Sequence, residues 1–549
     1  MKTNFFKSSF LALAMMASFS ACTQNEEFGT PAPADEDILN VVAYSNNFVS
    51  TDAASRITDN GTTTTFTDGD AIGVFIVREG EALVSNMKMT LSGTAWKGDN
   101  DAPLYYYKNA DYIAYYPYTA NLAVTTVDEI VQYFTSKISA TGQTSLADYR
   151  NADLMTAEVK AADVVRGKNI TFSFAHKMAM LEVKAPVRSY TTSTTYGDAE
   201  SAKAFTYKAP LGLKVVNGSQ ELSLCNVGTD AVEGKDIFRC ILVPSETEMT
   251  IEGQFQDGNV EVYFPAVSQE VKYTPAAGTY QGINIDYDYD YGTTGSTRDL
   301  KVGDYYYSDG SIYPGDLTGA PKDGCVGIIF STTTSTTDQG LGWSHGYVVS
   351  LFDTDANKHS WSALDEDIVN LKLYEKTIAS FTEAFADYDG YSATQAVLAT
   401  TNYSSTNYAA VSSAVNYSKV IPNTTSGWYL PSIGQVALII NELGAKKGTE
   451  PSNLFAPENA MDGLSGGTGK FDENRGAPEA MKALEETLGK VGGKFDYNTT
   501  GSYRWWTSSG VNSDNTKAWA IDTNFAKFLL YDADKTTDGN MYVRPVFAF

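Results

Sequence analysis

The sequence predicts a mostly β protein, with two β-sandwiches followed by an α+β domain. The chain holds 45 Gly, 35 Tyr and 26 Phe together with long runs of Thr and Ser, and these residue types favour pleated strands and tight turns over helices. Its 549 residues exceed one ordinary domain of roughly 150 residues. Hydrophobic residues make up 43% and charged residues 19%, close to the average of folded soluble proteins. We therefore expect several domains that fold in water.

The chain is also strongly acidic. It carries 66 Asp and Glu against 40 Lys and Arg, which gives a formal net charge of −26 at pH 7. A surface of this sign repels phosphate backbones and anionic lipid headgroups. We therefore expect no nucleic acid among the partners of this protein.

Residues 1–21 predict a lipoprotein signal peptide. Two lysines precede an apolar stretch at 10–17 that is too short to span a bilayer as a stable helix. Small residues then stand immediately before Cys22, which resembles the lipobox at which bacterial signal peptidase cleaves. We expect Cys22 to be acylated and to hold the precursor at the outer membrane through lipid; the alternative is an ordinary secretion signal with an incidental cysteine. Residues 22–37 are rich in Pro, Ala and acidic residues and are expected to be a tether.

Residues 38–165 are predicted to form the first β-sandwich. Residues 38–44 have the composition of a strand, and the apolar run at 71–77 is bounded by turn residues, which is typical of a buried strand. Further strands are expected around Trp96 and at 112–116, with turn residues at the spacing found in sandwiches.

Residues 166–290 are predicted to form the second sandwich, and 291–299 a linker. Hydrophobic and polar residues alternate strictly at 170–176, as in a strand with one buried face. The apolar stretches at 180–183 and 240–244 predict further strands of the same domain.

Residues 300–549 are predicted to form the α+β domain. Six of the seven tryptophans lie here, together with the strongest helix signals. A capping box begins at Ser432 and is followed by an apolar helical stripe. Pro478 opens a second helix that Gly489 ends.

Three stretches of the first two domains, at 66–75, 115–118 and 174–183, resemble the Bacteroidetes fimbrillin family of pilus subunits. The resemblance implies two transthyretin-like β-sandwiches over about residues 38–290, export as a lipoprotein, and assembly by donor-strand exchange.

The stretches at 302–310, 427–432, 505–509 and 543–546 resemble the C-type-lectin-like domain that some fimbrillins carry after the sandwiches. The calcium-dependent sugar motif of true C-type lectins is absent from residues 300–549. The resemblance therefore implies a lectin-like fold without implying calcium-dependent sugar binding; cation binding by this domain stays open, and we expect no cofactor.

Arg56 is the sole basic residue between Lys7 and Arg78. A trypsin-like protease needs a cation in its specificity pocket, so we expect cleavage after Arg56 and a mature chain that starts at Ile57. In the fimbrillin family such a cut removes the first strand and opens a groove for a neighbour's strand. Loss of residues 38–44 would expose unpaired backbone groups that an extended segment can bind. The alternative is an arginine in a surface loop with no such role.

The cysteines and histidines suggest neither a disulfide scaffold nor a metal site. Beyond the leader only Cys225, Cys240 and Cys325 remain, too few to cross-link an exported chain of this size. A Cys225–Cys240 bridge and three buried, unpaired cysteines both stay open. The three histidines lack the spacing of metal ligands.

Four tryptophans of the last domain divide into two groups. Trp428 and Trp505 lie inside the stretches that define the fold, so we expect them in the core. Trp343 and Trp361 lie in loops rich in Gly, Ser and Asp and are candidate ligand contacts, together with their neighbouring loops.

A catalytic role for the acidic residues of the last domain is possible in principle. Asp309, Asp353 and the acidic run at 365–367 could supply the paired carboxylates of a glycoside hydrolase. Nothing in their spacing requires this chemistry, so we do not expect an enzyme.

The leading functional hypothesis is a fimbrial subunit, assembled on the cell surface by strands donated from other pilus subunits. We expect it at the fibre tip, because the place of a donor strand is taken by a folded domain whose final strand, at 542–549, is needed for its own sheet. The last domain would then bind a glycan or protein ligand. The alternatives are a surface lipoprotein that binds glycans without polymerising, and a glycan-processing enzyme.

Overall fold

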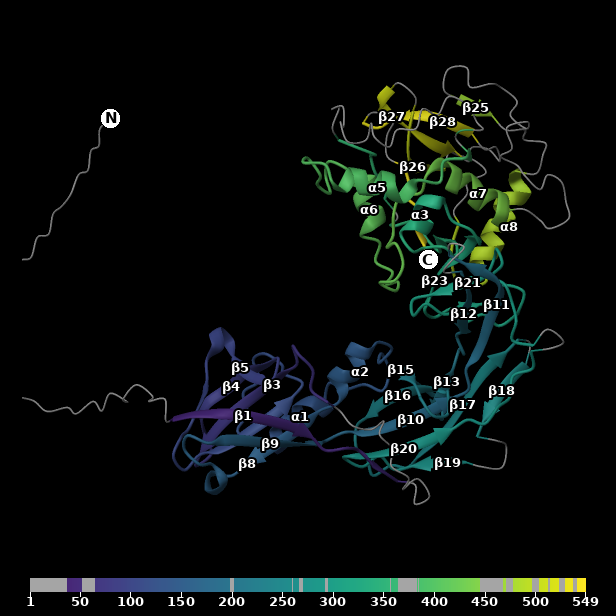
Figure 1. The fold of residues 1–549 in the computed structure, drawn as a ribbon. Helices are drawn as coiled ribbons and strands as arrows, with labels where there is room; N and C mark the ends of the chain where they lie inside the picture. The colour runs from purple at the N-terminus through teal and green to yellow at the C-terminus, as the bar shows by residue number, and fades with distance from the viewer. Residues whose placement is uncertain are drawn as a thin grey trace, which may run out of the picture. The chain divides into compact units, whose positions relative to one another are not determined.

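The structure is a computed structural model, and it describes the chain from residue 37 to 549 with gaps. The gaps are at 52–64, 198–201, 259, 266–269, 292–294, 356, 364–382, 384, 445–467, 471–476, 496–502, 512–513, 523–528 and 537–540. The chain forms two compact units (Figure 1). One comprises Met1–Ser45, Thr65–Ile130 and Thr156–Phe174, and the other comprises Asn46–Thr64, Val131–Met155 and Ala175–Phe549.

The first unit is built on an eight-stranded sheet with the order β5-β4-β3-β7-β8-β9-β1-β6. Its elements are β1 (Ile38–Ser45), β3 (Ala71–Arg78), β4 (Glu81–Ser92), β5 (Ala95–Gly98), β6 (Leu104–Tyr105), β7 (Asp111–Tyr116), β8 (Met155–Val159), β9 (Asn169–His176) and helix α1 (Val127–Thr135). The predicted strand at 71–77 is β3, which is buried from Ile72 to Val77. Glycine at position 73 lets the ring of Tyr115 lie against the backbone, because a Cβ there would overlap that ring.

The pairing in this unit is continuous rather than split into two separate sheets. The ring of Phe66 contacts Trp96 of β5 and Phe174 of β9, each with ring centroids 5.3 Å apart. Because β5 and β9 stand far apart in the strand order, this contact shows that the sheet closes over its own core.

The second unit begins with a β-sandwich of two sheets. One has the order β15-β16-β10-β20-β2, and the other has the order β14-β13-β17-β18 with β19 also paired to β17. Their elements are β2 (Val49–Ser50), β10 (Ala179–Ala185), β13 (Lys214–Asn217), β14 (Gln220–Leu222), β15 (Cys225–Thr229), β16 (Asp236–Leu242), β17 (Met249–Asp257), β18 (Val260–Phe264), β19 (Val271–Tyr273), β20 (Thr279–Asn284) and helix α2 (Leu146–Ala152). Leu181 of β10, Val215 of β13 and Phe255 of β17 share one core cluster, so the two sheets pack face to face.

A long hairpin joins this sandwich to the remainder of the second unit. It consists of β11 (Arg188–Tyr196) and β12 (Lys203–Ala209), and its Tyr190 and Tyr207 belong to the core of the last domain. The described part of the expected linker, from residue 295 onward, is tied to this hairpin. The Thr191 backbone N–H donates to the Ser296 carbonyl at 2.9 Å, and Arg298 forms a bidentate pair with Asp304 at 2.7 and 2.8 Å.

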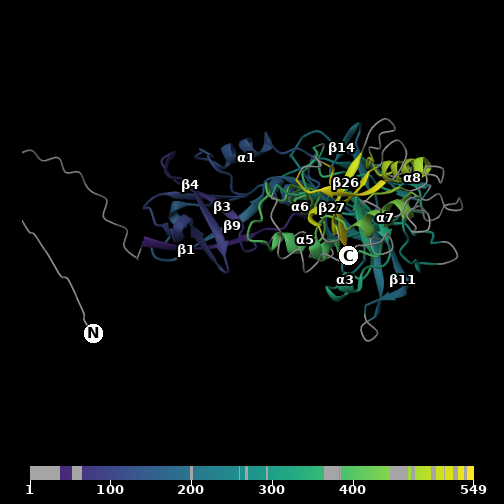
Figure 2. The same ribbon diagram turned by 90° about the horizontal axis from the view of Figure 1, so that it is seen from above.

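The last domain is α+β, as the sequence predicts. It has a sheet of order β22-β21-β23-β24-β29 and a second of order β25-β28-β27-β26. Its strands are β21 (Tyr305–Tyr307), β22 (Ile312–Tyr313), β23 (Cys325–Ser331), β24 (Tyr347–Ser350), β25 (Thr468–Lys470), β26 (Arg504–Val511), β27 (Asp514–Asp522), β28 (Leu529–Asp534) and β29 (Val546–Ala548). Its helices include α3 (Thr336–Gly340), α5 (Gly390–Leu398), α6 (Ala409–Val415), α7 (Ile433–Leu443) and α8 (Ala477–Gly489). Helices α5, α6 and α7 cluster with β26 and β27 in both views (Figures 1 and 2).

The helix signals and the core tryptophans are confirmed. Ser432 caps α7 through the predicted capping box with Gln435, and α8 ends at Gly489. Trp428 and Trp505 are buried. None of the helices in the described part of the chain is long and apolar enough to cross a membrane.

The three cysteines are unpaired and buried, which decides between the two alternatives left open by the sequence. Burial raises the pKa of the Cys240 and Cys325 thiols to about 12. They therefore stay protonated near neutral pH and pack as small apolar side chains.

Candidate functional site

Strand β1 lies inside the first unit's sheet although it comes from the start of the described chain. It runs parallel to β9, with Asn40 opposite Asn169 and Ser45 opposite Phe174. On its other side it pairs antiparallel with β6, where Ile38 lies opposite Tyr105. Removal of β1 would therefore leave unpaired backbone groups along two strands, which is the arrangement an extended peptide can bind.

The side chains of β1 hold the strand only weakly. Leu39 is buried at 3% exposure, whereas Val42 and Tyr44 on the outer face are 42% and 50% exposed. The inward positions beyond Leu39 carry Val41, Ala43 and Ser45, which are all smaller than leucine and are only partly buried. Because apolar stabilisation scales with the area removed from water, the second half of β1 contributes little beyond its main-chain hydrogen bonds.

Residues 48–51 anchor the following segment within the second unit. The ring of Phe48 stacks on that of His176 with centroids 3.7 Å apart, and the Nδ1 atom of His176 lies 2.8 Å from Asp153. Strand β2 pairs with the start of β20, and the Thr51 backbone N–H donates to the Tyr280 carbonyl at 3.0 Å. Cys22, Arg56 and Ile57 lie outside the described residues.

Trp361 is a core residue, contrary to the expectation that its ring is free to contact a ligand. It is 1% exposed and packs with residues of α6 such as Ala410 and Val411. Its indole N–H donates to the Thr507 carbonyl at 2.8 Å, and the Lys535 ammonium lies 4.6 Å from the ring centroid. With its ring enclosed, Trp361 has no face to offer a ligand.

Trp343 is partly buried, and its ring packs edge-on against Tyr391 at 4.7 Å between centroids. Its carbonyl accepts a hydrogen bond from the Thr334 hydroxyl at 2.7 Å. Two neighbours in the same loop, Gly342 and His345, line a cleft. The loop of Trp343 thus contributes to this cleft, although neither tryptophan is among the residues that line it.

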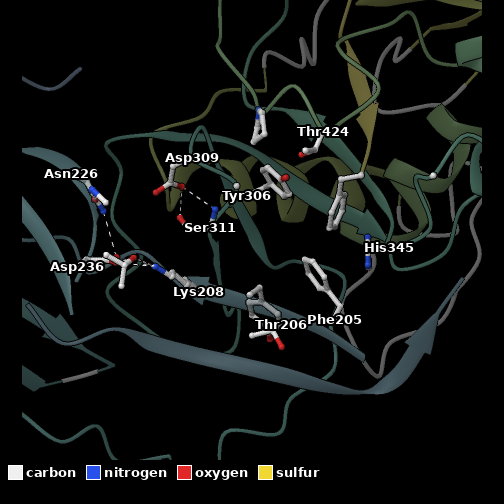
Figure 3. Close-up of a pocket in the computed structure, with 17 residues that line it drawn as sticks. Phe205, Thr206, Lys208, Asn226, Asp236, Tyr306, Asp309, Ser311, His345 and Thr424 are labelled. Carbon is white, nitrogen blue, oxygen red and sulfur yellow. Dashed lines mark hydrogen bonds and ion pairs between the residues drawn. The ribbon is translucent and has the colours of Figure 1, made fainter. Parts of the chain in front are cut away.

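The cleft has a volume of about 740 Å³ and is drawn in Figure 3. It lies between the β11–β12 hairpin, the β21–β22 turn and the loop that leads into β24. Its aromatic lining comprises Phe205, Tyr207, Tyr306, His345 and Phe549. Its polar lining comprises Thr206, Lys208, Asn226, Thr229, Asp236, Asp309, Ser311 and Thr424.

Charges within the cleft are largely balanced. The Lys208 ammonium lies 2.9 Å from the Asp236 carboxylate and 2.6 Å from the Thr229 hydroxyl. Burial lowers the pKa of His345, and a hydrogen bond with the Phe549 backbone opposes this shift. The imidazole is therefore neutral near pH 7, which leaves Asp309 as the remaining charged side chain of the lining.

The carboxylates considered for glycoside hydrolysis have different surroundings. Asp309 lines the cleft, whereas Asp353 is buried in an ion pair with Arg544 at 2.8 Å and accepts a hydrogen bond from Tyr503. The acidic run at 365–367 lies outside the described residues. Asp353 thus has a structural role as the partner of a buried arginine.

Comparison with known proteins separates the first two sheet regions from most of the last domain. Residues 55–308 match the family model described as fimbrillin-like. The matched region starts beside Arg56 and ends within the β21–β22 turn, so most of the last domain lies beyond it.

The whole chain has relatives that extend past the fimbrillin-like region. It is 27% identical over 481 residues to a Bacteroides ovatus protein named as the fimbrium tip subunit Fim1C, covering 78% of this chain and 85% of that one. A crystal structure of a fimbrial protein from Bacteroides ovatus is 20% identical, covers 93% of this chain and 99% of that chain, and gives a TM-score of 0.44. A structure from Bacteroides uniformis, described as a cell adhesion protein, covers 46% of this chain and 94% of that one at 18% identity and a TM-score of 0.27.

Proposed function

We propose that this protein is the tip subunit of a fimbria and that it accepts a neighbour's strand in place of β1. The observation that carries the proposal is the position of β1, which is paired on both edges and yet half exposed. The fimbrillin-like match and the similarity to a protein named as a fimbrium tip subunit support it. The subunit would act at the cell surface with other fimbrial subunits as partners.

Exchange needs a donor that binds the same groove more tightly than β1 does. A donor strand reproduces the main-chain hydrogen bonds to β9 and β6, so the difference lies in the inward side chains. Larger apolar residues at the positions of Ala43 and Ser45 would bury more area, at ~0.8 kcal/mol per fully buried CH₂ group. The small inward residues of β1 therefore favour its replacement.

Release of β1 requires a break in the chain, and cleavage after Arg56 would supply it. Among the described residues, the peptide that ends at Arg56 would then be held by an ion pair of Asp37 with Arg166, by β1, by Phe48 and by the contacts of β2 and Thr51. These contacts are non-covalent and span both units, so one cut frees the whole N-terminal segment.

A tip position is supported by the contacts of the segment that follows the second sandwich. The Tyr287 hydroxyl donates to Asp257 at 2.7 Å, and the Tyr289 hydroxyl donates to the Pro186 carbonyl at 3.1 Å. This segment therefore packs onto its own domain and is not available to a neighbour while these contacts hold. Residues 300–549, a C-type-lectin-like domain in this proposal, would face outward and serve adhesion.

The cleavage step is tested with an arginine-specific protease and N-terminal sequencing. The wild-type chain should yield a product that begins at Ile57, and Arg56→Gln should not. Arg150→Gln removes an exposed arginine of α2 and is the matched control, which should be cut like the wild type. A mature chain that retains residues 38–51 in isolated fimbriae would contradict exchange. Absence of the chain from isolated fimbriae, with the uncut chain on the cell surface, would favour the surface lipoprotein that binds glycans without polymerising.

The lipoprotein step is tested separately. Acylation of Cys22 predicts incorporation of a palmitate analogue by the wild-type precursor and loss of that label in Cys22→Ala, because no other acceptor is expected in the leader. Equal labelling of both chains would refute the anchor while leaving strand exchange untouched.

A further inference from the structure

The cleft of Figure 3 is lined by a tyrosine, Tyr306, whose hydroxyl is open to the cleft. Tyr306 is 4% exposed, and its ring is fixed by Phe547 and Phe549 with centroids 5.0 and 4.9 Å away. Within the described part of the chain its hydroxyl makes no hydrogen bond, and the residue lines the cleft (Figure 3). Burial raises the pKa of Tyr306, so the hydroxyl remains a donor. A ligand in the cleft can therefore form a hydrogen bond with this hydroxyl while the ring stays fixed.

The turn between β21 and β22 leaves the approach to this hydroxyl open. Gly310 has a φ of +86°, and a Cβ there would lie 3.8 Å from the Tyr306 hydroxyl and 3.3 Å from Pro422. A side chain at 310 would therefore be strained and would also crowd the hydroxyl. Beside it, the Oδ1 atom of Asp309 accepts hydrogen bonds from the Ser311 N–H at 2.9 Å and hydroxyl at 2.6 Å. Its Oδ2 atom has no hydrogen-bond partner among the described residues.

An aromatic wall, formed by Phe205 and His345, lies across the cleft from Asp309 (Figure 3). Phe205 of β12 is partly exposed, and its ring packs on His345 with centroids 4.1 Å apart. His345 is held in turn by its backbone N–H, which donates to the Phe549 carbonyl at 2.8 Å. The aromatic wall is thus fixed from both the hairpin and the last domain before any ligand arrives.

The charges of the lining decide the class of ligand. The sole lysine or arginine among the described lining residues, Lys208, is already paired with Asp236, so nothing there offsets a phosphate, sulfate or carboxylate. Groups that suit the remaining surface are neutral, carry several hydroxyls and have an apolar face. The hydroxyls of a hexose can donate to Asp309 and accept from Tyr306, while its C–H face packs on an aromatic ring.

We propose that this cleft binds a neutral oligosaccharide, with Tyr306 and Asp309 holding sugar hydroxyls and Phe205 supporting a ring face. Its volume of about 740 Å³ falls within the range of ligand pockets, ~300–1,000 Å³. A second cleft shares Lys208, Asn226, Asp309 and other residues with the first. The second cleft also contains Lys214 and Lys322, so the proposal for a neutral ligand concerns the first cleft alone.

This inference gives a ligand class to the adhesive role proposed for residues 300–549, and it can be tested without assembling a fimbria. The full chain, kept in solution by Cys22→Ala, is applied to an array of neutral, sialylated and sulfated oligosaccharides and a lysine-rich peptide. The strongest neutral binder is then measured by calorimetry. Because strand exchange plays no part in this assay, its failure would leave the cleavage and exchange results standing.

Three variants probe the site, and a fourth is the matched control. Tyr306→Phe removes one oxygen atom and should weaken binding ~3- to 10-fold. Asp309→Asn, which keeps an acceptor for Ser311, should weaken it by a similar factor, and Gly310→Ala should weaken it more by crowding the hydroxyl. Tyr263→Phe, on an exposed tyrosine of β18 whose residue does not line either cleft, should bind like the wild type.

Several outcomes would overturn the proposal. These are no binding to any neutral oligosaccharide, binding confined to acidic sugars or to the lysine-rich peptide, and equal affinity of Tyr306→Phe and wild type. Unfolding curves for each variant separate a loss of binding from a loss of fold. If Gly310→Ala fails to fold, the other two variants still decide the result.

Discussion

Strands β1 and β29 each complete a sheet with residues distant in sequence, but they are held differently. β1 exposes Val42 and Tyr44 on its outer face, and its inward side chains after Leu39 are smaller than leucine and only partly buried. β29 is buried at every position, and pairs with β24 while Val546 also bridges to Tyr429. β1 has a strand on each side, whereas β29 is the last strand of its sheet. Main-chain pairing therefore does not make β1 the weaker strand, and the difference in side-chain burial marks it as the strand that can be exchanged.

The residues around β29 extend this contrast. Phe547 packs edge-on against Trp428 and Tyr306, with centroids 4.8 and 5.0 Å apart. Arg544, just before the strand, is buried and paired with Asp353. A buried ion pair that loses one partner is costly, so this end of the domain resists any displacement of its strand.

The largest expected effect compares side-chain deletions in the two strands. Phe547→Ala should lower the free energy of unfolding by ~3–5 kcal/mol, because it empties a fully buried site. Tyr44→Ala removes a half-exposed ring and should cost less than ~1 kcal/mol. Urea unfolding of both variants measures the difference, and similar losses would remove the basis of the contrast.

The inward face of β1 can be tested with synthetic strands. A peptide of residues 37–51 that carries Ala43→Val should bind the cleaved chain about 5-fold more tightly than the native peptide, because added methyl groups are partly buried in the groove. The same peptide with Val42→Ala changes the exposed face and should bind almost unchanged. Fluorescence anisotropy of labelled peptides measures both, and weaker binding of the Ala43→Val peptide would show that the groove has no room for a larger donor.

The smallest expected effect is the pH dependence of stability that comes from His345, whose backbone holds Phe549. Burial holds the pKa of His345 below its ordinary value of 6.5, so the unfolded chain binds a proton more readily than the folded one. The contribution of the neutral imidazole is therefore complete above about pH 6.5 and is lost as pH falls below it. Wild type should lose more stability than His345→Gln between pH 7.5 and 5, measured by thermal unfolding, and parallel losses would contradict this reading.

Much of the fold follows from local sequence patterns. The apolar run at 71–77 and the alternation at 170–176 became β3 and β9, because burial on one or both faces leaves a direct signature in the order of residues. The cap at Ser432 was equally clear, since its hydrogen bonds lie within one helical turn. Gly73 belongs to a stretch singled out from the sequence, but the reason for a glycine there is the ring of Tyr115, which comes from β7.

The candidate sites were predicted only in part. Trp361 lies in an Asp-rich stretch but is enclosed by α6 and by the strand that contains Thr507, and such packing is not encoded near the tryptophan. Phe205 and Tyr306 were missed for the same reason, because the cleft joins a hairpin and a turn that are distant in sequence. Asp309 was considered as a catalytic carboxylate and not as a binding residue, and the loop of Trp343 reaches the cleft through Gly342 and His345.

The central claim is that β1 is exchangeable once the chain is cut. The most direct measurement mixes the chain, after cleavage by an arginine-specific protease, with an excess of labelled peptide 37–51 and follows its incorporation by native mass spectrometry. The account predicts one labelled peptide bound per cleaved chain and none on uncleaved Arg56→Gln. Failure of the cleaved chain to take up the peptide, with its original segment still in place, would contradict it.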